Sequence, residues 1–282
     1  MPSLRHLITT FALLGALAPA GAGTQPSQTD IPYGPAPEQR FDLYAPTPTR
    51  DAPLILMVHG GAWRLGDKDS GRVVDNKVAR WLPRGIAFAS VNYRLQPKAA
   101  PLEQARDVAR ALAAIQRDAR QYGIDGDNIV LMGHSAGAHL IALLAARPDL
   151  LAEQDARPWR GTVLLDSGAL DVPAIMNARH LPLYDRAFGS NPADWLAASP
   201  YHQMRQPGAP MLVVCSARRA NACRQAGDFV TKVQGLGGQA ILMPLDKTHG
   251  EINAQLGDDA NYTASVEQHL GAWSPAFATR LK

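Results

Sequence analysis

The sequence has few cysteines and little excess charge of either sign. Its 282 residues include two cysteines, and two thiols without nearby histidines fall short of the four ligands of a structural zinc site. The formal net charge is only +3, which leaves no electrostatic footprint for nucleic acid or for an anionic membrane surface. No repeat of fixed period and no low-complexity tract is visible. We therefore expect a globular protein without metal, nucleic-acid partner or stable membrane insertion.

The apolar run near the N-terminus is short for a membrane-spanning helix. It extends from Leu7 to Leu17, about half of the ~20 residues that a bilayer demands. Arg5 precedes it, and the small residues Ala18-Pro19-Ala20 and Ala20-Gly21-Ala22 follow it. A basic region, an apolar region and an A-x-A cleavage site in this order are typical of a secretory signal peptide. We therefore expect residues 1–22 to be removed and the protein to be secreted or periplasmic, with a retained anchor as the alternative.

The two cysteines lie close together in the chain. Cys215 and Cys223 are eight positions apart, and no other thiol competes for either of them. In an oxidising compartment they are expected to form a disulfide, for which the chain-entropy estimate is ~2–3 kcal/mol. Two reduced, unrelated cysteines are the alternative.

Segments typical of strands and of helices alternate along the chain, which predicts a mostly parallel sheet with helices on both faces. The length without the leader suits one α/β domain, which we place at residues 40–282. Residues 23–39, rich in Pro, Ser and Gln, are expected to be a flexible lead-in. The expected strands cover 41–44, 54–58, 86–91, 129–132, 162–165, 211–215 and 240–245, and the expected helices include 73–81 and 102–122.

A candidate nucleophile lies in the run Gly133-His134-Ser135-Ala136-Gly137, which matches G-x-S-x-G. An apolar strand-like run precedes it and an Ala- and Leu-rich, helix-forming stretch follows it. Two glycines allow the strand-to-helix turn to be so sharp that the serine hydroxyl stands exposed at the carboxyl edge of the sheet, the nucleophile elbow. Ser135 is therefore the candidate nucleophile.

A second motif, His59-Gly60-Gly61-Ala62-Trp63, follows the apolar run at 54–58. It resembles the HGGG-type oxyanion loop of esterases and lipases, in which small residues let backbone N–H groups approach a negatively charged oxygen. By alignment with that motif, the N–H groups of Gly61 and Ala62 would act together with that of Ala136.

The candidate general base is His249, which follows the strand-like run 240–245 near the C-terminus. A base must reach the serine proton, and in this chain order the histidine comes last. For the other histidines a surface or packing role is expected; they are His6, His59, His134, His139, His180, His202 and His269.

From about Arg40 to Leu270 the chain resembles the α/β-hydrolase superfamily, specifically carboxylesterases related to hormone-sensitive lipase and the feruloyl and acetyl esterase-like enzymes. The strand ending in Asn92-Tyr93-Arg94-Leu95 and the turn at Gly123-Ile124-Asp125 add to the three motifs. The resemblance implies a single α/β-hydrolase domain, no cofactor, and a small lid, residues 171–210, between strands six and seven.

The acid that should orient His249 is not where most of these relatives carry it, after the seventh strand. That stretch, residues 216–223, contains Asn221 but no carboxylate. In some lipases of the same fold the acid follows the sixth strand, where this chain has Asp166. Asp171 is the second choice, and a dyad without an acid is the third possibility.

The resemblance further implies a substrate wall that includes Trp63 and, from the lid, Tyr184 and Tyr201. The expected function is that of a secreted serine carboxylesterase acting on a small, short-acyl ester through an acyl-enzyme intermediate. The string from Gly133 to His139 also resembles arylformamidases, so an amidase is an alternative. A non-catalytic hydrolase-fold binding protein is another, and the sequence leaves the oligomeric state open.

Overall fold

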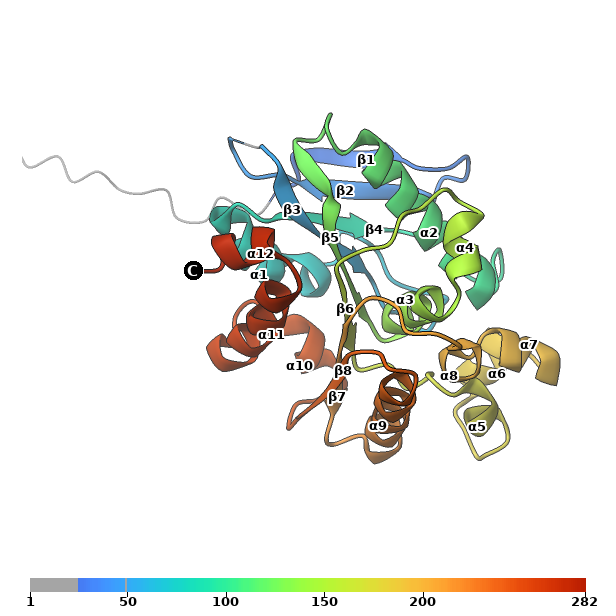
Figure 1. Cartoon of the computed structure of the whole chain (residues 1–282). Helices are drawn as coiled ribbons and strands as arrows, with labels where there is room; N and C mark the ends of the chain where they lie inside the picture. The colour runs from blue at the N-terminus through green and yellow to red at the C-terminus, as the bar shows by residue number, and fades with distance from the viewer. Residues whose placement is uncertain (1–24, 49) are drawn as a thin grey trace, which may run out of the picture.

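A computed structural model of the chain describes residues 25–48 and 50–282, and the expected signal peptide at residues 1–22 lies outside them. The fold is a sheet of eight strands with helices packed on both faces (Figure 1). This confirms the predicted α/β-hydrolase architecture.

The strands are β1 (Gln28–Pro32), β2 (Arg40–Tyr44), β3 (Ala52–Val58), β4 (Ala87–Val91), β5 (Ile124–His134), β6 (Gly161–Leu165), β7 (Met211–Ser216) and β8 (Ala240–Leu245). The helices are α1 (Gly71–Trp81), α2 (Pro101–Asp118), α3 (Ala136–Ala146), α4 (Pro148–Ala152), α5 (Val172–Met176), α6 (Pro182–Phe188), α7 (Pro192–Ala197), α8 (Pro200–Gln203), α9 (Ala220–Gly235), α10 (His249–Ala254), α11 (Ala260–Trp273) and α12 (Pro275–Arg280), with a 3₁₀ turn at Leu82–Arg84.

The strand order is β1-β2-β4-β3-β5-β6-β7-β8. The pairs β1–β2 and β2–β4 are antiparallel, and all later pairs are parallel. Because the carboxyl ends of parallel strands meet at one edge of the sheet, the loops after β3, β5, β6, β7 and β8 lie together. Every candidate catalytic residue is in one of these loops or at the helix start that follows it.

Both faces of the sheet are buried along its central strands, which is why β3, β4, β6 and β7 are continuous apolar runs. One core cluster joins the sheet to α2, α3 and α9. The other joins it to α1, α10, α11 and α12, which lie together on the opposite face (Figure 1). The sheet that carries the site is thus packed by helices on both faces.

The prediction of a flexible lead-in at residues 23–39 is wrong for its described part. Residues Gln28–Pro32 form the edge strand β1, which pairs with β2. The backbone N–H of Asp30 donates to the Asp42 carboxylate at 2.8 Å, and the nearby ring of Tyr33 is buried. Backbone pairing and one aromatic anchor order a segment whose own composition is polar.

The connection between β6 and β7 consists of four short helices, α5 to α8, gathered at one end of the molecule (Figure 1). They occupy the segment in which a lid was expected, at residues 171–210. Among the described residues, no helix is both long and apolar enough to cross a membrane.

Cys215 and Cys223 form a disulfide, with their Cα atoms 5.1 Å apart. Cys215 is the buried penultimate residue of β7, and Cys223 lies in the first turn of α9. The bond therefore ties α9 to the end of β7 across the loop that leads into the candidate site.

Reduction of this disulfide should lower the free energy of unfolding by about 2–3 kcal/mol, because it releases the closed loop in the unfolded chain. Urea denaturation with and without reductant measures the difference, and the Cys215→Ser/Cys223→Ser double variant should match the reduced protein. Two free thiols in unreduced peptides of the exported protein would contradict the pairing.

Candidate active site

Ser135 stands on a sharp turn between β5 and α3. Its backbone has φ 56° and ψ −116°, a combination that a non-glycine residue adopts only under strain. Its N–H donates to the carbonyl of Leu165 at 2.9 Å, which ties the turn to the end of β6. A Cβ on Gly137 would lie 2.2 Å from the Val58 carbonyl oxygen, so only glycine lets α3 start this close to β3. The turn has the geometry expected of a nucleophile elbow.

The loop after β3 lies directly against this turn. A Cβ on Gly60 would come within 2.9 Å of the Ser135 Cβ. Gly61, Ala62 and Trp63 all have positive φ, which turns the backbone sharply toward the serine. In the described loops, the N–H groups of Gly61, Ala62 and Ala136 donate to no protein acceptor. They are therefore free to donate to a ligand.

Strained backbone is concentrated at this site. Seven described non-glycine residues have positive φ, and four of them are Ala62, Trp63, Ser135 and Asp166. Each such residue costs on the order of 1–3 kcal/mol, and such residues cluster where function demands a particular geometry. The strain thus marks the same residues that the motifs indicate.

Asp166 and His249 are joined by a hydrogen bond. The Nδ1 of His249 lies 2.6 Å from Oδ2 of Asp166, and the carboxylate is fully buried. Its other oxygen accepts from the Ser216 N–H at 3.0 Å. Burial would by itself raise the pKa of this carboxyl. The hydrogen bonds from His249 and Ser216, with the charge of Arg219, outweigh burial and lower the pKa to about 2, so the group is ionised at neutral pH.

The other proposed partners of His249 lie elsewhere. Asp171 is the N-cap of α5, where its side chain accepts from the Ala174 N–H at 3.0 Å. Asn221 is an exposed residue in the first turn of α9. Of the acids considered from sequence, only Asp166 therefore reaches the histidine ring.

Arg219 is a site residue that the sequence analysis missed. It occupies the loop after β7, where most relatives were expected to carry the acid. Its Nη1 lies 2.5 Å from Oδ2 of Asp166 and 2.9 Å from Nδ1 of His249. The only sequence signal for it is the missing carboxylate in this loop, residues 216–223.

The helix that begins with His249 is fixed at both ends. Thr248 and Glu251 form a capping box at its N-terminus. At its C-terminus, the carbonyl of Ala254 accepts from the Asn76 amide at 2.7 Å, and that of Asn253 accepts from Lys77 Nζ at 2.6 Å. Helix α1, on the outer face of the sheet, thus holds the helix that presents the imidazole.

Three other histidines surround the elbow, and all are buried. Burial, together with the charge of His249, lowers the pKa of His134 to about 3. Burial lowers the pKa of His139 to about 4 and also lowers that of His59. They are neutral packing residues, as expected from the sequence, and of the four histidines around the elbow only His249 is partly exposed and has a carboxylate partner.

The candidate nucleophile and the candidate base lie in neighbouring loops at the carboxyl edge of the sheet. The ring of His134, the neighbour of Ser135, lies 4.4 Å from that of His249. No hydrogen bond joins the Ser135 hydroxyl to His249 in the described part of the chain. Such bonds are often long in unliganded proteins and shorten when substrate binds.

The three residues expected on the substrate wall have different surroundings. Trp63 is only 3% exposed; its Nε1–H donates to His139 Nδ1 at 3.1 Å and its ring packs on Phe188. It is a core residue rather than an open wall. Tyr201 lies under Lys232 Nζ, 4.6 Å from its ring centroid, and no described contact joins it to Ser135. Tyr184 alone lines a cavity beside the Asp166–His249 pair.

No group of three or more His, Cys, Asp or Glu side chains in residues 25–48 and 50–282 could hold a metal ion.

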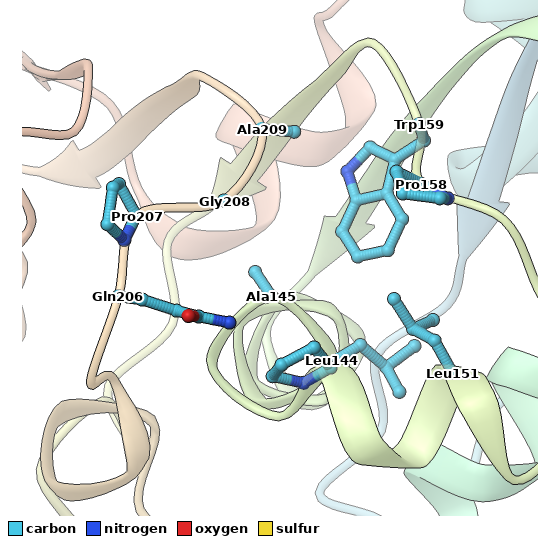
Figure 2. Close-up of a pocket in the computed structure, with 10 residues that line it drawn as sticks. Leu144, Ala145, Leu151, Pro158, Trp159, Gln206, Pro207, Gly208 and Ala209 are labelled. Atoms are coloured by element: carbon cyan, nitrogen blue, oxygen red, sulfur yellow. The ribbon is translucent and has the colours of Figure 1, made fainter.

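An apolar cavity of about 210 Å³ lies between α3, α4 and the loops before β6 and β7, where Trp159 and Leu151 face it (Figure 2). Those loops are at the amino ends of the strands, so this cavity is on the opposite edge of the sheet from Ser135.

Residues 41–158 match the BD-FAE family model. This part holds the oxyanion loop and Ser135, whereas Asp166 and His249 lie beyond it. The chain is 36% identical over 132 residues to a probable isoprenylcysteine alpha-carbonyl methylesterase of Oryza sativa subsp. japonica, covering 46% of this chain and 30% of the relative. It is 31% identical over 202 residues to the esterase LipQ of Mycobacterium tuberculosis, covering 66% and 47%. The chain thus spans less than half the length of these relatives.

Among solved structures, the fold is similar to that of esterase B from Lactobacillus Rhamnosis, with a TM-score of 0.73 and 18% identity. The match covers 90% of this chain and 86% of the other. At this identity the likeness establishes the fold.

If Asp166 orients His249, Asp166→Asn should slow fluorophosphonate labelling of Ser135 by orders of magnitude, because the amide removes charge and allows the wrong tautomer. Labelling rates read by intact mass test this, and circular dichroism confirms folding. Asn221→Ala and Asp171→Asn serve as controls and should change the rate little. Slow labelling in either control, with a normal rate in Asp166→Asn, would transfer the role to that residue.

Proposed function

We propose that the chain is a serine carboxylesterase of the hormone-sensitive-lipase and esterase-like branch of the α/β-hydrolases, and that it hydrolyses short-acyl esters. The observation that carries the proposal is the 2.6 Å hydrogen bond between the buried Asp166 carboxylate and His249, beside a serine on a strained elbow. A nucleophile, a base held by an acid, and free N–H donors are the parts that acyl transfer requires.

In the proposed mechanism, the Ser135 oxygen attacks the ester carbonyl while Nε2 of His249 takes its proton. Asp166 holds Nδ1–H and stabilises the imidazolium. The free N–H groups of Gly61, Ala62 and Ala136 donate to the negative oxygen of the tetrahedral intermediate. His249 then protonates the leaving alcohol, which leaves an acyl group on Ser135. Water, activated by His249, releases the acid and regenerates the serine.

A preference for short acyl groups is supported by the packing beside the oxyanion loop. The rings of Trp63 and Phe188 are 4.9 Å apart, and those of Tyr184 and Phe188 are 6.4 Å apart and stacked. These aromatic side chains fill the volume between the loop and helix α6 that a long acyl chain would need.

A secreted or periplasmic location is part of the proposal. The order of basic, apolar and small residues in the first 22 positions supports it. The Cys215–Cys223 disulfide supports it as well, because such bonds persist mainly in oxidising compartments.

Two alternative functions predict different results in the hydrolysis experiments described next. An arylformamidase-like amidase would use the same residues on a formyl amide. The histidine of the resembling string, His139, has a packing role here, since Nε2 donates to the Ala198 carbonyl at 2.8 Å. A non-catalytic binding protein would react with no serine probe.

Ser135→Ala should abolish hydrolysis of 4-nitrophenyl acetate and butyrate, because it removes the nucleophile without opening a cavity. Loss of a triad nucleophile costs several orders of magnitude in turnover. Steady-state rates test this, with N-formylkynurenine as the amide comparison. Residual ester hydrolysis within about tenfold of the parent would reject Ser135 as nucleophile, and faster turnover of the formyl amide would favour the amidase.

The protein exported from a bacterial host should lack residues 1–22, since the cleavage motif ends there. Intact mass of the periplasmic or medium fraction measures the new N-terminus, with the chain started at residue 23 as a cytoplasmic control. Full-length protein found only in the membrane fraction would instead support a retained anchor.

A further inference from the structure

A cavity of about 400 Å³ opens beside the Asp166–His249 pair, between helices α5 and α6 and the start of α9. We call it the arginine cavity, because its charged lining is basic and includes no carboxylate. The lining residues used below are Gly168, Arg179, His180, Tyr184, Arg219 and Arg224.

Arg219 connects this cavity to the catalytic pair. Of the guanidinium nitrogens of Arg219, only Nη1 makes hydrogen bonds within the described residues. It donates to the carboxylate and to the backbone carbonyl of Asp166, and it lies 2.9 Å from Nδ1 of His249. Nη2 of Arg219 donates to no described residue and lies beside Gly168, which also lines the cavity. A ligand that binds them therefore lies one residue away from the base.

A second donor converges on the same space. A Cβ built on Gly168 would lie 3.1 Å from Nη2 of Arg219 and 3.1 Å from the hydroxyl of Tyr184. That hydroxyl makes no hydrogen bond among the described residues, and burial raises its pKa, so it stays a neutral donor. Because residue 168 is glycine, the space between the two donors is open. A group with two acceptor oxygens fits their arrangement.

The charges around the cavity favour an anion. Arg179 has neither an ion pair nor a hydrogen bond within residues 25–48 and 50–282. Four carboxylates on the segments around the cavity lie outside its lining and are already paired. Asp171 is paired with His202 at 3.6 Å. Asp166 is paired with Arg219 and His249, Asp185 with His180 at 2.8 Å, and Asp228 with Arg224 at 3.6 Å.

We propose that the arginine cavity is a subsite for a carboxylate carried by the ester substrate, bound by Arg219 Nη2, Tyr184 Oη and the unpaired Arg179. The inference rests on the proposed esterase function and narrows its substrate class to esters with a free carboxylate. A planar carboxylate suits a guanidinium, with which it forms charge-assisted hydrogen bonds.

The test compares matched esters with and without a carboxylate. 4-Acetoxybenzoate against 4-acetoxybenzamide places the charge in the alcohol half. Mono(4-nitrophenyl) adipate against 4-nitrophenyl hexanoate places it in the acyl half. For each pair the ratio of kcat/KM is divided by the ratio of the uncatalysed rates. At least one corrected ratio should be roughly ten or more, the usual size of a hydrogen bond to a charged group, and it should fall as salt is added.

Two variants should bring that ratio toward one. Arg179→Gln removes the unpaired charge from an exposed position. Gly168→Ala keeps every charge but places a methyl group 3.1 Å from both donors, and its backbone is allowed because Gly168 is not among the positive-φ residues. Arg186→Gln is the matched control, since Arg186 is also an unpaired arginine of the lid segment among the described residues but lines other cavities. If Gly168→Ala fails to fold, the Arg179 comparison decides.

Corrected ratios near one for both pairs, with good turnover of neutral esters, would overturn the subsite and leave the esterase function standing. An equal decrease of the corrected ratio in Arg186→Gln would also overturn it. The general positive potential of this segment, rather than a specific subsite, would then explain the preference for a carboxylate. If no ester is hydrolysed, the esterase function fails, and calorimetry of 4-hydroxybenzoate and adipate with Ser135→Ala decides the subsite. Binding that Gly168→Ala abolishes would support it, and no binding would reject it.

Discussion

The buried carboxylate of Asp166 is the point on which the site depends. A charge removed from water is tolerated only when hydrogen bonds and opposite charge replace the lost solvation. Here the replacement comes from the Ser216 N–H at the end of β7, from Arg219 before α9, and from His249 at the start of α10. One side chain at the end of β6 thus joins two segments that are distant from it in the sequence, residues 216–219 and the start of α10. Its position follows from the sheet, because β6 pairs directly with β7.

The nucleophile side of the site is held by different means. Strained backbone at Ser135 and Ala62 persists because the surrounding strands over-determine it, and small residues allow the approach of one loop to the other. His139 then links this half to the lid segment, since it accepts from Trp63 and donates to the Ala198 carbonyl. The two halves are joined below the site by the pairing of β5 with β6.

What the sequence could reveal depended on how local each signal was. The buried parallel strands are continuous apolar runs, and Ser135 and His249 lie in short motifs, so both kinds of prediction needed no knowledge of distant residues. Strand β1 is polar and largely exposed, and it is ordered by pairing with β2. The composition of residues 28–32 alone does not indicate this pairing. Trp63 is the last residue of the expected oxyanion loop, and the sequence therefore predicts that it contacts the substrate. Its burial depends on His139, 76 positions away in the chain.

The position of the acid explains why a basic residue could enter the site. With Asp166 at the end of β6, the loop after β7 has no catalytic side chain to supply and can carry Arg219 instead. In the proposed mechanism His249 becomes positively charged, and an arginine beside it is unfavourable by itself, since like charges repel. The carboxylate contacts both groups and offsets part of that repulsion. A substrate carboxylate on the free face of Arg219 would offset more of it. In the proposed subsite, recognition of the substrate and stabilisation of the imidazolium would therefore act through one guanidinium.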